Sequence, residues 1–189
     1  MANLNLKGHK SFALILCVGS VSALAGHPAK PYSEQEVRQV ITPNEQKVNE
    51  IRDQEISQLK LTLSRRIPEQ RRADLYLRLA EIYIEKYRAE FLLEGRAHEA
   101  RIDKRLADPF IDRSRSKPYL KAAISACKEI LDFKIQYPRL DQVFYFLAYN
   151  YSELGEVAQA KRYYLQLVQS FPQSAYTVEA YKELGEGAY

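Results

Sequence analysis

The chain has 189 residues, 46% of them hydrophobic and 28% charged, which suits one soluble helical domain with an appended segment. The formal net charge of +4 is mild and gives no support to nucleic acid as the main partner. The seven glycines are too few for a glycine-rich phosphate-binding loop and fit long helices joined by few turns.

The first 25 residues differ from the rest of the chain. Lys7 and Lys10 precede the apolar run FALILCVGSVSALA, which ends at Ala25. A basic start, a short apolar run and small residues at its end are typical of a secretory signal peptide. Residues 1–25 are therefore predicted to be a signal peptide that is cleaved after Ala25; the alternative is a buried N-terminal helix.

Cys17 offers a different kind of signal, one in which this cysteine carries a lipid anchor. Leu16 stands where lipoprotein signals have a small residue, so cleavage after Ala25 is favoured over an anchor at Cys17. The chain is thus predicted to be exported. Cys127 is then the one remaining thiol and has no partner for an internal disulfide. Its place beside Ala126 favours a small core residue over a reactive thiol.

Residues 26–43 are predicted to be a flexible leader, because they hold three prolines among small and polar residues. An N-terminal helix is predicted over 44–68, capped by Asn44 or Thr42 and ended by Pro68. Its apolar residues keep helical spacing but are diluted by charge.

The longest helical pattern runs over residues 69–102 and predicts one extended helix. The loop 103–117 that follows is interpreted as a solvated linker. The alternative is a basic patch that touches an acidic partner or anionic lipid headgroups, with Phe110 and Ile111 as apolar contacts and with peripheral membrane contact as the consequence. The basic residues of this loop are Lys104, Arg105, Arg113, Arg115 and Lys117.

Residues 141–174 indicate two amphipathic helices joined at Gly155 and closed by Pro172. Similar sets of large and small apolar residues occur upstream and downstream, and second-helix positions recur after 34 residues. The residues predicted to form this repeat core are Tyr76, Leu79, Ala80, Tyr83, Ala126, Ile130, Phe144, Leu147, Ala148, Tyr151, Ala160, Tyr164, Leu184 and Gly185.

This spacing resembles the tetratricopeptide repeat (TPR). The resemblance implies an all-α, right-handed solenoid of helical hairpins over 69–189, with about two and a half repeats, one extended helix, the loop 103–117 and an N-terminal helix in front. The third repeat ends at Tyr189 after its first helix. That helix is expected either to act as a cap or to belong to a longer array.

A closer resemblance is to TPR proteins of the Gram-negative cell envelope, namely the outer-membrane assembly lipoproteins, the Tol–Pal accessory factor and gliding-motility-associated proteins. It implies an adaptor in an envelope complex, placed in the periplasm or at the periplasmic face of the outer membrane. The residues that carry the resemblance are Phe171, Pro172, Ser174, Tyr176, Ala180, Leu184 and Gly185, together with the long helix RADLYLRLAEIYIEKYRAEFL.

Sequence motifs for catalysis or cofactor chemistry are not found. The three histidines, His9, His27 and His98, form no H-E-x-x-H motif, and there is no cysteine pair, aspartate-rich loop or nucleophile elbow. The chain is therefore predicted not to be an enzyme and to use no metal, cofactor or small-molecule substrate.

Binding of other proteins is the predicted function, because the first helices of stacked hairpins line a concave surface. The chain would be an adaptor or scaffold; the alternative is a structural subunit that assembles by repeat stacking without a client peptide. Exposed tyrosines are good anchors, although packing of Tyr145 and Tyr149 against a neighbouring hairpin is an equal alternative. The predicted partner-binding residues are Arg78, Glu81, Gln142, Tyr145, Tyr149, Ser152 and Lys182.

Overall fold

The computed structural model describes residues 30–104 and 110–186; the predicted signal peptide and the first residues of the predicted leader lie outside this part. The all-α prediction is confirmed for the described residues, which form seven helices and no strand. None of these helices combines the length and apolar character needed to span a membrane. The helices are α1 (Glu34–Val40), α2 (Pro43–Leu63), α3 (Glu69–Asp103), α4 (Lys117–Asp132), α5 (Leu140–Glu153), α6 (Val157–Ser170) and α7 (Thr177–Glu186).

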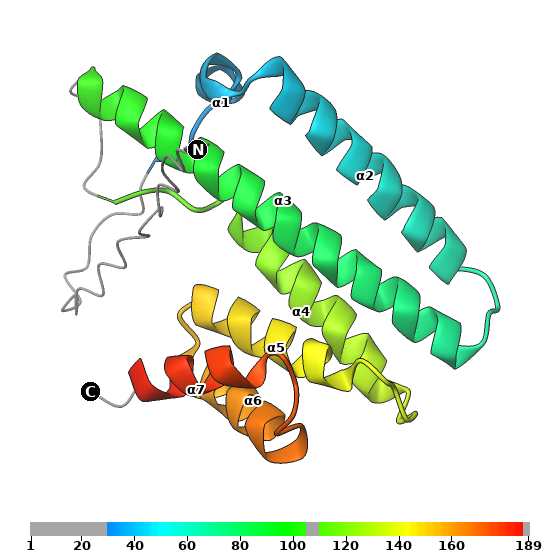
Figure 1. Cartoon of the computed structure of the whole chain (residues 1–189). Coiled ribbons are helices and arrows are strands. Elements are labelled where there is room, and N and C mark those ends of the chain that lie inside the picture. The colour runs from blue at the N-terminus through cyan, green and yellow to red at the C-terminus, as the bar shows by residue number, and fades with distance from the viewer. Residues whose placement is uncertain (1–29, 105–109, 187–189) are drawn as a thin grey trace, which may run out of the picture.

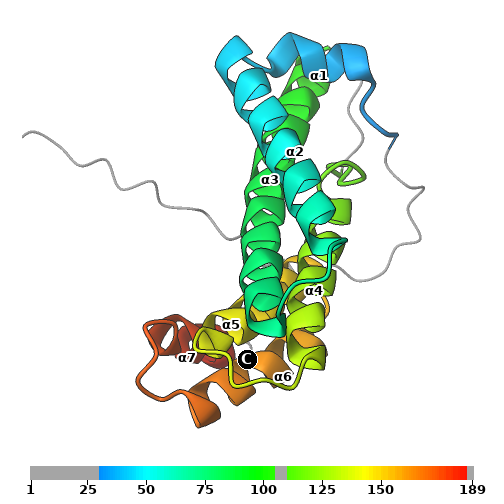
Figure 2. The ribbon, with the colours of Figure 1, turned by 90° about the vertical axis from the view of Figure 1, so that its right-hand side faces the viewer.

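The long helix α3 is the element on which the others are arranged (Figure 1). Helix α2 runs antiparallel to it on one side, α4 packs on another side, and α1 lies near its C-terminal end. From α4 onward each helix packs on the next one in the chain, so that α5, α6 and α7 gather at the end where α3 begins (Figure 2).

Helix α3 spans Glu69–Asp103, which agrees with the helix predicted over 69–102. Pro68 immediately precedes it, where proline is well tolerated because the first amides of a helix lack intrahelical partners. The first half of α3 contributes fully buried residues such as Leu77 and Ile82 to the main core. Its second half belongs to a separate small cluster through Leu93 and Ala97. One helix thus connects two cores.

The residues predicted as repeat core lie mostly inside the main core. Ten of them are at most 7% exposed, whereas Tyr76, Phe144 and Leu184 pack at its edge. Gly155 has φ of 80° at the turn between α5 and α6, a conformation that glycine adopts without strain. The ten buried residues are Leu79, Ala80, Tyr83, Ala126, Ile130, Leu147, Ala148, Tyr151, Ala160 and Tyr164.

Gly185 was predicted to belong to the repeat core, but it does not lie there. It is exposed, and a Cβ atom added to it would meet no other atom within 4 Å. The small residue that α7 buries is Ala180, at 0% exposure, while Tyr181 is 59% exposed. Only Gly185 is therefore misplaced on α7, because Leu184 shares the face of Thr177 and Ala180 and packs at the edge of the main core.

The flexible leader predicted over 26–43 is wrong for the described residues, since these include helix α1. Ser33 and Glu36 form a capping box, in which the Ser33 hydroxyl accepts from the Glu36 amide and the Glu36 carboxylate accepts from the Ser33 amide. Val37 is 4% exposed and packs in the small cluster with Leu93. The prolines that suggested a leader lie outside the helix.

Helix α2 begins and ends earlier than predicted. Thr42 caps it through a second capping box with Glu45, so Thr42 rather than Asn44 is the cap. The helix ends at Leu63, and the turn that follows reaches Pro68. Proline restricts the residue before it to extended conformations, which moves the helix end upstream.

The predicted loop is only partly a basic surface. Arg113 donates to the Tyr87 hydroxyl at 2.6 Å, and Arg115 pairs with Glu90 at 3.0 Å and with Glu34 at 2.6 Å. Both arginines therefore hold the loop against α3 and α1 and do not face an external partner. Phe110 and Ile111 are exposed, as are Lys104 and Lys117; residues 105–109 lie outside the described part.

Acid should release α1 from α3 before the core unfolds. Two arginines of α3 hold α1 and the start of α2: Arg101 pairs with Glu36 of α1 at 2.6 Å, and Arg96 pairs with Glu45 of α2 at 2.8 Å and donates to the Val40 carbonyl of α1. These bonds lower the pKa of each glutamate from 4.5 to about 2. A lowered pKa stabilises the folded state above the ordinary value, and the stabilisation is lost as pH falls from about 5 toward 2.

The expected result is a fall in the hydrogen-exchange protection factors of α1 between about pH 5 and pH 3, with α5 amides as the internal control. An equal fall in α1 and α5 would show that the two ion pairs do not hold α1 separately.

Candidate functional site

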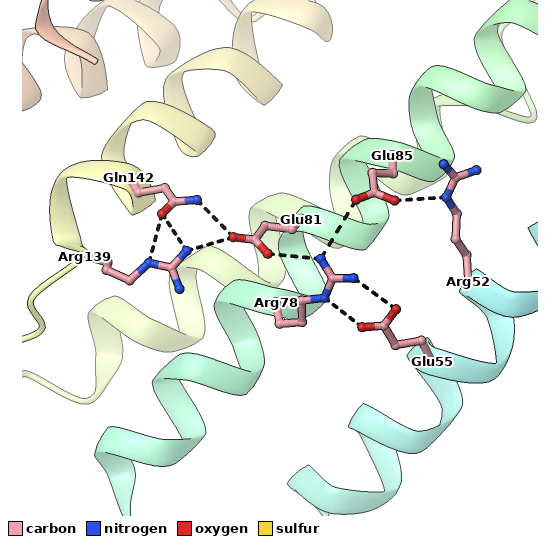
Figure 3. A network of polar contacts seen from close by, with 7 residues as sticks. All are labelled: Arg52, Glu55, Arg78, Glu81, Glu85, Arg139 and Gln142. Carbon is pink, nitrogen blue, oxygen red and sulfur yellow. Dashed lines mark hydrogen bonds and ion pairs between the residues drawn. The ribbon is translucent and has the colours of Figure 1, made fainter. Parts of the chain in front are cut away.

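One face of α3 carries charged side chains that meet both α2 and α5 (Figure 3). Arg78, Glu81 and Glu85 are three or four residues apart and so share this face. We call the set the α3 face; its members are Arg52 and Glu55 of α2, Arg78, Glu81 and Glu85 of α3, Arg139 immediately before α5, and Gln142 of α5.

Arg78 connects α3 to α2. Its Nε donates to Glu55 Oε1 at 2.7 Å and its Nη2 to Glu55 Oε2 at 3.1 Å, a bidentate pair. Nη1 donates to Glu81 Oε2 at 3.3 Å, and Arg52 pairs with Glu85 at 3.1 Å. The bonds to Glu55 and Glu81 raise the pKa of Arg78 above its ordinary value.

Glu81 connects α3 to α5. Its Oε1 accepts from Arg139 Nη2 at 2.9 Å and from Gln142 Nε2 at 3.0 Å. Arg139 also donates to Gln142 Oε1 at 2.8 Å, which closes a three-residue ring of contacts. The structure thus brings together three predicted partner-binding residues, Arg78, Glu81 and Gln142, and holds them by contacts to one another.

Tyr145 and Tyr149 pack against neighbouring elements, which was the alternative to their being fully exposed anchors. The Tyr145 ring stacks on Tyr176 with centroids 4.7 Å apart and an interplanar angle of 18°. Arg88 of α3 lies over the Tyr149 ring at 5.5 Å. Burial raises the pKa of both hydroxyls, and both rings remain partly accessible beside the α3 face.

The other two predicted residues are not brought into this set. Ser152 is exposed near the end of α5, and no described contact joins its side chain to the α3 face. Lys182 is exposed on α7, where it pairs with Glu179 at 3.7 Å. Neither residue shares a contact with Arg78 or Glu81.

A groove of about 460 Å³ opens between α2 and α3 and continues the α3 face. Arg52 and Glu85 belong to both, so one ion pair forms the boundary. Val48 is 43% exposed and Leu92 is 58% exposed, which leaves apolar surface at the groove. The residues that line this α2–α3 groove are Asn44, Glu45, Val48, Asn49, Arg52, Glu85, Arg88, Ala89, Leu92 and Leu93.

The sequence did not reveal this groove. Val48 and Leu92 keep helical spacing with other apolar residues of their helices, a pattern that does not separate exposed residues from buried ones. Their spacing tells which face of a helix they share, but exposure depends on how closely the next helix approaches. An apolar residue that stays exposed beside polar neighbours is the signal that distinguishes a binding groove from a core.

No model of a protein family, no curated protein and no solved structure matches this chain.

The side chains of the described residues also limit the chemistry of the site. They include no group of three or more His, Cys, Asp or Glu residues that could hold a metal ion. Cys127 is fully buried, and burial raises the pKa of its thiol well above the ordinary value, which keeps it protonated and unreactive. The α3 face and the α2–α3 groove offer paired charges and apolar surface, which are binding features.

Proposed function

We propose that the chain is a non-enzymatic adaptor or scaffold that binds a segment of another protein at the α2–α3 groove and along the α3 face. The observation that carries this proposal is the exposed apolar surface of Val48 and Leu92 in a groove of about 460 Å³. Exposed apolar residues gathered in a groove mark binding sites for an amphipathic segment.

The ion pairs of the α3 face support the same function. Because Arg78, Glu81 and Arg139 are fixed by one another, their side chains lose little conformational entropy when a partner arrives. Their charges are mostly compensated, so the face suits a partner of mixed polarity. Partly exposed Tyr145 and Tyr149 next to this face add rigid aromatic contact area.

The arrangement of α3 to α7 is proposed to be a TPR-like array. In support of this, helices pack in chain order and the small residues Ala80, Ala148 and Ala160 are at most 5% exposed where helices approach. Second-helix positions recur after 34 residues. The resemblance to envelope TPR proteins and the signal-like pattern of residues 1–25 support action in the periplasm or at the periplasmic face of the outer membrane.

A second function, assembly by stacking of repeats, is favoured by α7. Val178 is 80% exposed and Tyr181 is 59% exposed on this C-terminal helix. A helix that leaves two large apolar side chains uncovered fits a contact with another subunit. In that case the chain would be a structural subunit of an envelope or motility complex.

Leu92→Asp is expected to weaken partner capture by the tagged full chain in its source cell. A charge in an apolar anchor position costs about 2 kcal/mol or more of binding, which is roughly a 30-fold loss of affinity. Capture is measured by quantitative mass spectrometry, and circular dichroism checks that helix content is unchanged.

Val157→Asp is the matched control, because Val157 is 65% exposed at the start of α6 and far in sequence from the groove. Retention of the partner by the control and loss by Leu92→Asp supports the groove. Equal capture by both variants would refute it, and loss only with Val178→Asp would favour assembly through α7.

A further inference from the structure

The turn between α2 and α3 concentrates positive charge. Residues 60–72 hold five basic side chains and one acidic one, Glu69, for a net charge of +4, as large as that of the whole chain. We call the five basic residues the basic tip: Lys60, Arg65, Arg66, Arg71 and Arg72.

Three arginines of the basic tip carry charges that no nearby acidic side chain among the described residues compensates. Arg65, Arg66 and Arg71 are exposed and form no ion pair with any residue that the structure describes. By contrast, Arg78 and Arg96 each pair with a glutamate. Uncompensated like charges close together repel one another and attract an anionic ligand.

Aromatic rings hold the other two basic residues in place. The Arg72 guanidinium lies 5.3 Å from the centre of the Phe133 ring, and the Lys60 ammonium lies 5.8 Å from the Tyr83 ring. Such cation–π contacts restrain the side chain without neutralising its charge. Arg72 and Lys60 therefore remain positively charged while their side chains are held in place.

A second groove, of about 440 Å³, lies directly beside the basic tip and is lined by residues of α2, α3 and α4. Lys60 and Ser64 belong to its α2 side, so the tip and the groove are continuous. We call it the tip groove; it is lined by Lys60, Leu63, Ser64, Tyr76, Leu79, Tyr83, Ala122, Ser125, Ala126 and Glu129.

The tip groove is separate from the α3 face. Tyr76, Leu79 and Tyr83 point about 150° around the helix axis from the side of α3 that carries Arg78 and Glu81, at 100° per residue. A ligand in the tip groove would not touch the α3 face. The two surfaces can therefore be tested independently.

We propose that the basic tip and the tip groove bind an acidic segment of a partner protein that carries an apolar side chain. Carboxylates of the segment would pair with Lys60, Arg65 and Arg66, and the apolar side chain would lie on Tyr76 and the neighbouring aliphatic carbons. Charge complementarity identifies the acidic part, and the apolar groove identifies the anchor.

Glu129 distinguishes a peptide from a lipid headgroup. Its carboxylate belongs to the tip groove, where it would repel a phosphate or a carboxylate but can accept a hydrogen bond from a peptide amide, so the acidic side chains of the segment would lie at the basic tip and its uncharged part in the groove. A groove between three helices also accommodates one side chain better than a bilayer surface does. The proposal is therefore a protein segment.

The test measures binding of the fluorescein-labelled peptide Glu-Glu-Leu-Phe-Glu-Glu to the full chain by fluorescence anisotropy. Arg65→Glu/Arg66→Glu is expected to weaken binding by about tenfold or more, since two ion pairs become repulsions. Ser125→Trp should also weaken binding, because Ser125 is exposed and a large side chain there would fill the groove.

Lys161→Glu/Arg162→Glu is the matched control, since both residues are adjacent and exposed on α6 and the net charge changes equally. Unchanged affinity in this control, with loss in the other two variants, supports the proposal. Equal weakening in both charge variants would overturn it in favour of nonspecific attraction. The proposal would also be overturned if the peptide did not bind, or if only vesicles of anionic phosphatidylglycerol bound.

Discussion

Leu147→Ala is expected to lower the free energy of unfolding by about 2–5 kcal/mol. Leu147 is 0% exposed in the middle of α5 and belongs to the main core, where α5 packs against both α4 and α6. Removing three carbon atoms there loses their transfer free energy and leaves a cavity that helices on two sides cannot fill.

Urea unfolding followed by circular dichroism measures this change as a lower midpoint with an unchanged slope. Leu165→Ala on α6 is the control, because Leu165 is 38% exposed and is expected to cost less than about 1 kcal/mol. If both variants lost the same free energy of unfolding, Leu147 would not lie in a tightly packed core.

Glu94→Ala is expected to destabilise the protein by about 2–4 kcal/mol. Glu94 is 0% exposed on α3, and its Oε1 accepts from the backbone amides of Arg115 at 2.8 Å and Ser116 at 3.0 Å. These amides lie immediately before α4, and Ser116, the N-cap residue of α4, makes no side-chain capping bond. Alanine would leave both buried amides without an acceptor.

Glu94→Gln should keep most of the stability, because the amide oxygen of glutamine can accept the same bonds. Burial raises the pKa of Glu94 above its ordinary value of 4.5, although the amides of Ser116 and Arg115 oppose this. A raised pKa means that the folded state binds the proton of Glu94 more tightly than the unfolded state does. Protonation of Glu94 therefore stabilises the folded state at low pH, and this contribution is lost as pH rises.

The stability of the Gln variant relative to the native chain should therefore improve from about pH 4 to pH 8. Urea unfolding of the two proteins at both pH values measures the difference, and titration of all other groups cancels. A difference that does not depend on pH would show that Glu94 is not destabilised by burial.

Glu94 and the charged residues of the α3 face both attach other helices to α3. Glu94 fixes the start of α4 to α3, while Arg78 and Glu81 fix α2 and α5 to the same helix. Polar contacts thus set the positions of three helices on α3, whereas apolar burial supplies most of the stability. At the boundary of the α2–α3 groove, the ion pair of Arg52 with Glu85 likewise joins α2 to α3.

Sequence periodicity predicted the long helix well, because hydrophobic spacing and the lack of proline act locally. The helix predicted over 69–102 spans Glu69–Asp103 in the structure. Helix α1 was missed although Ser33 and Glu36 already form a recognisable capping-box pattern. The prolines around it were given more weight than this local signal.

Less of the candidate site could be predicted from the sequence. Helical spacing identified Arg78 and Glu81 on one face, but it could not show that Gln142, 61 residues further along the chain from Glu81, completes the network. Spacing also failed for Gly185, which was predicted in the repeat core and is exposed. These outcomes depend on how helices approach one another in three dimensions, which a single chain's periodicity does not encode.

Photo-crosslinking can show whether the α2–α3 groove receives a protein partner. A photoreactive phenylalanine derivative would replace Leu92 in one full-length chain and Val157 in another, each expressed in the source cell. A discrete adduct with one partner protein from position 92 and none from position 157 is the predicted result. The same adducts from both positions, or none from position 92, would contradict the claim.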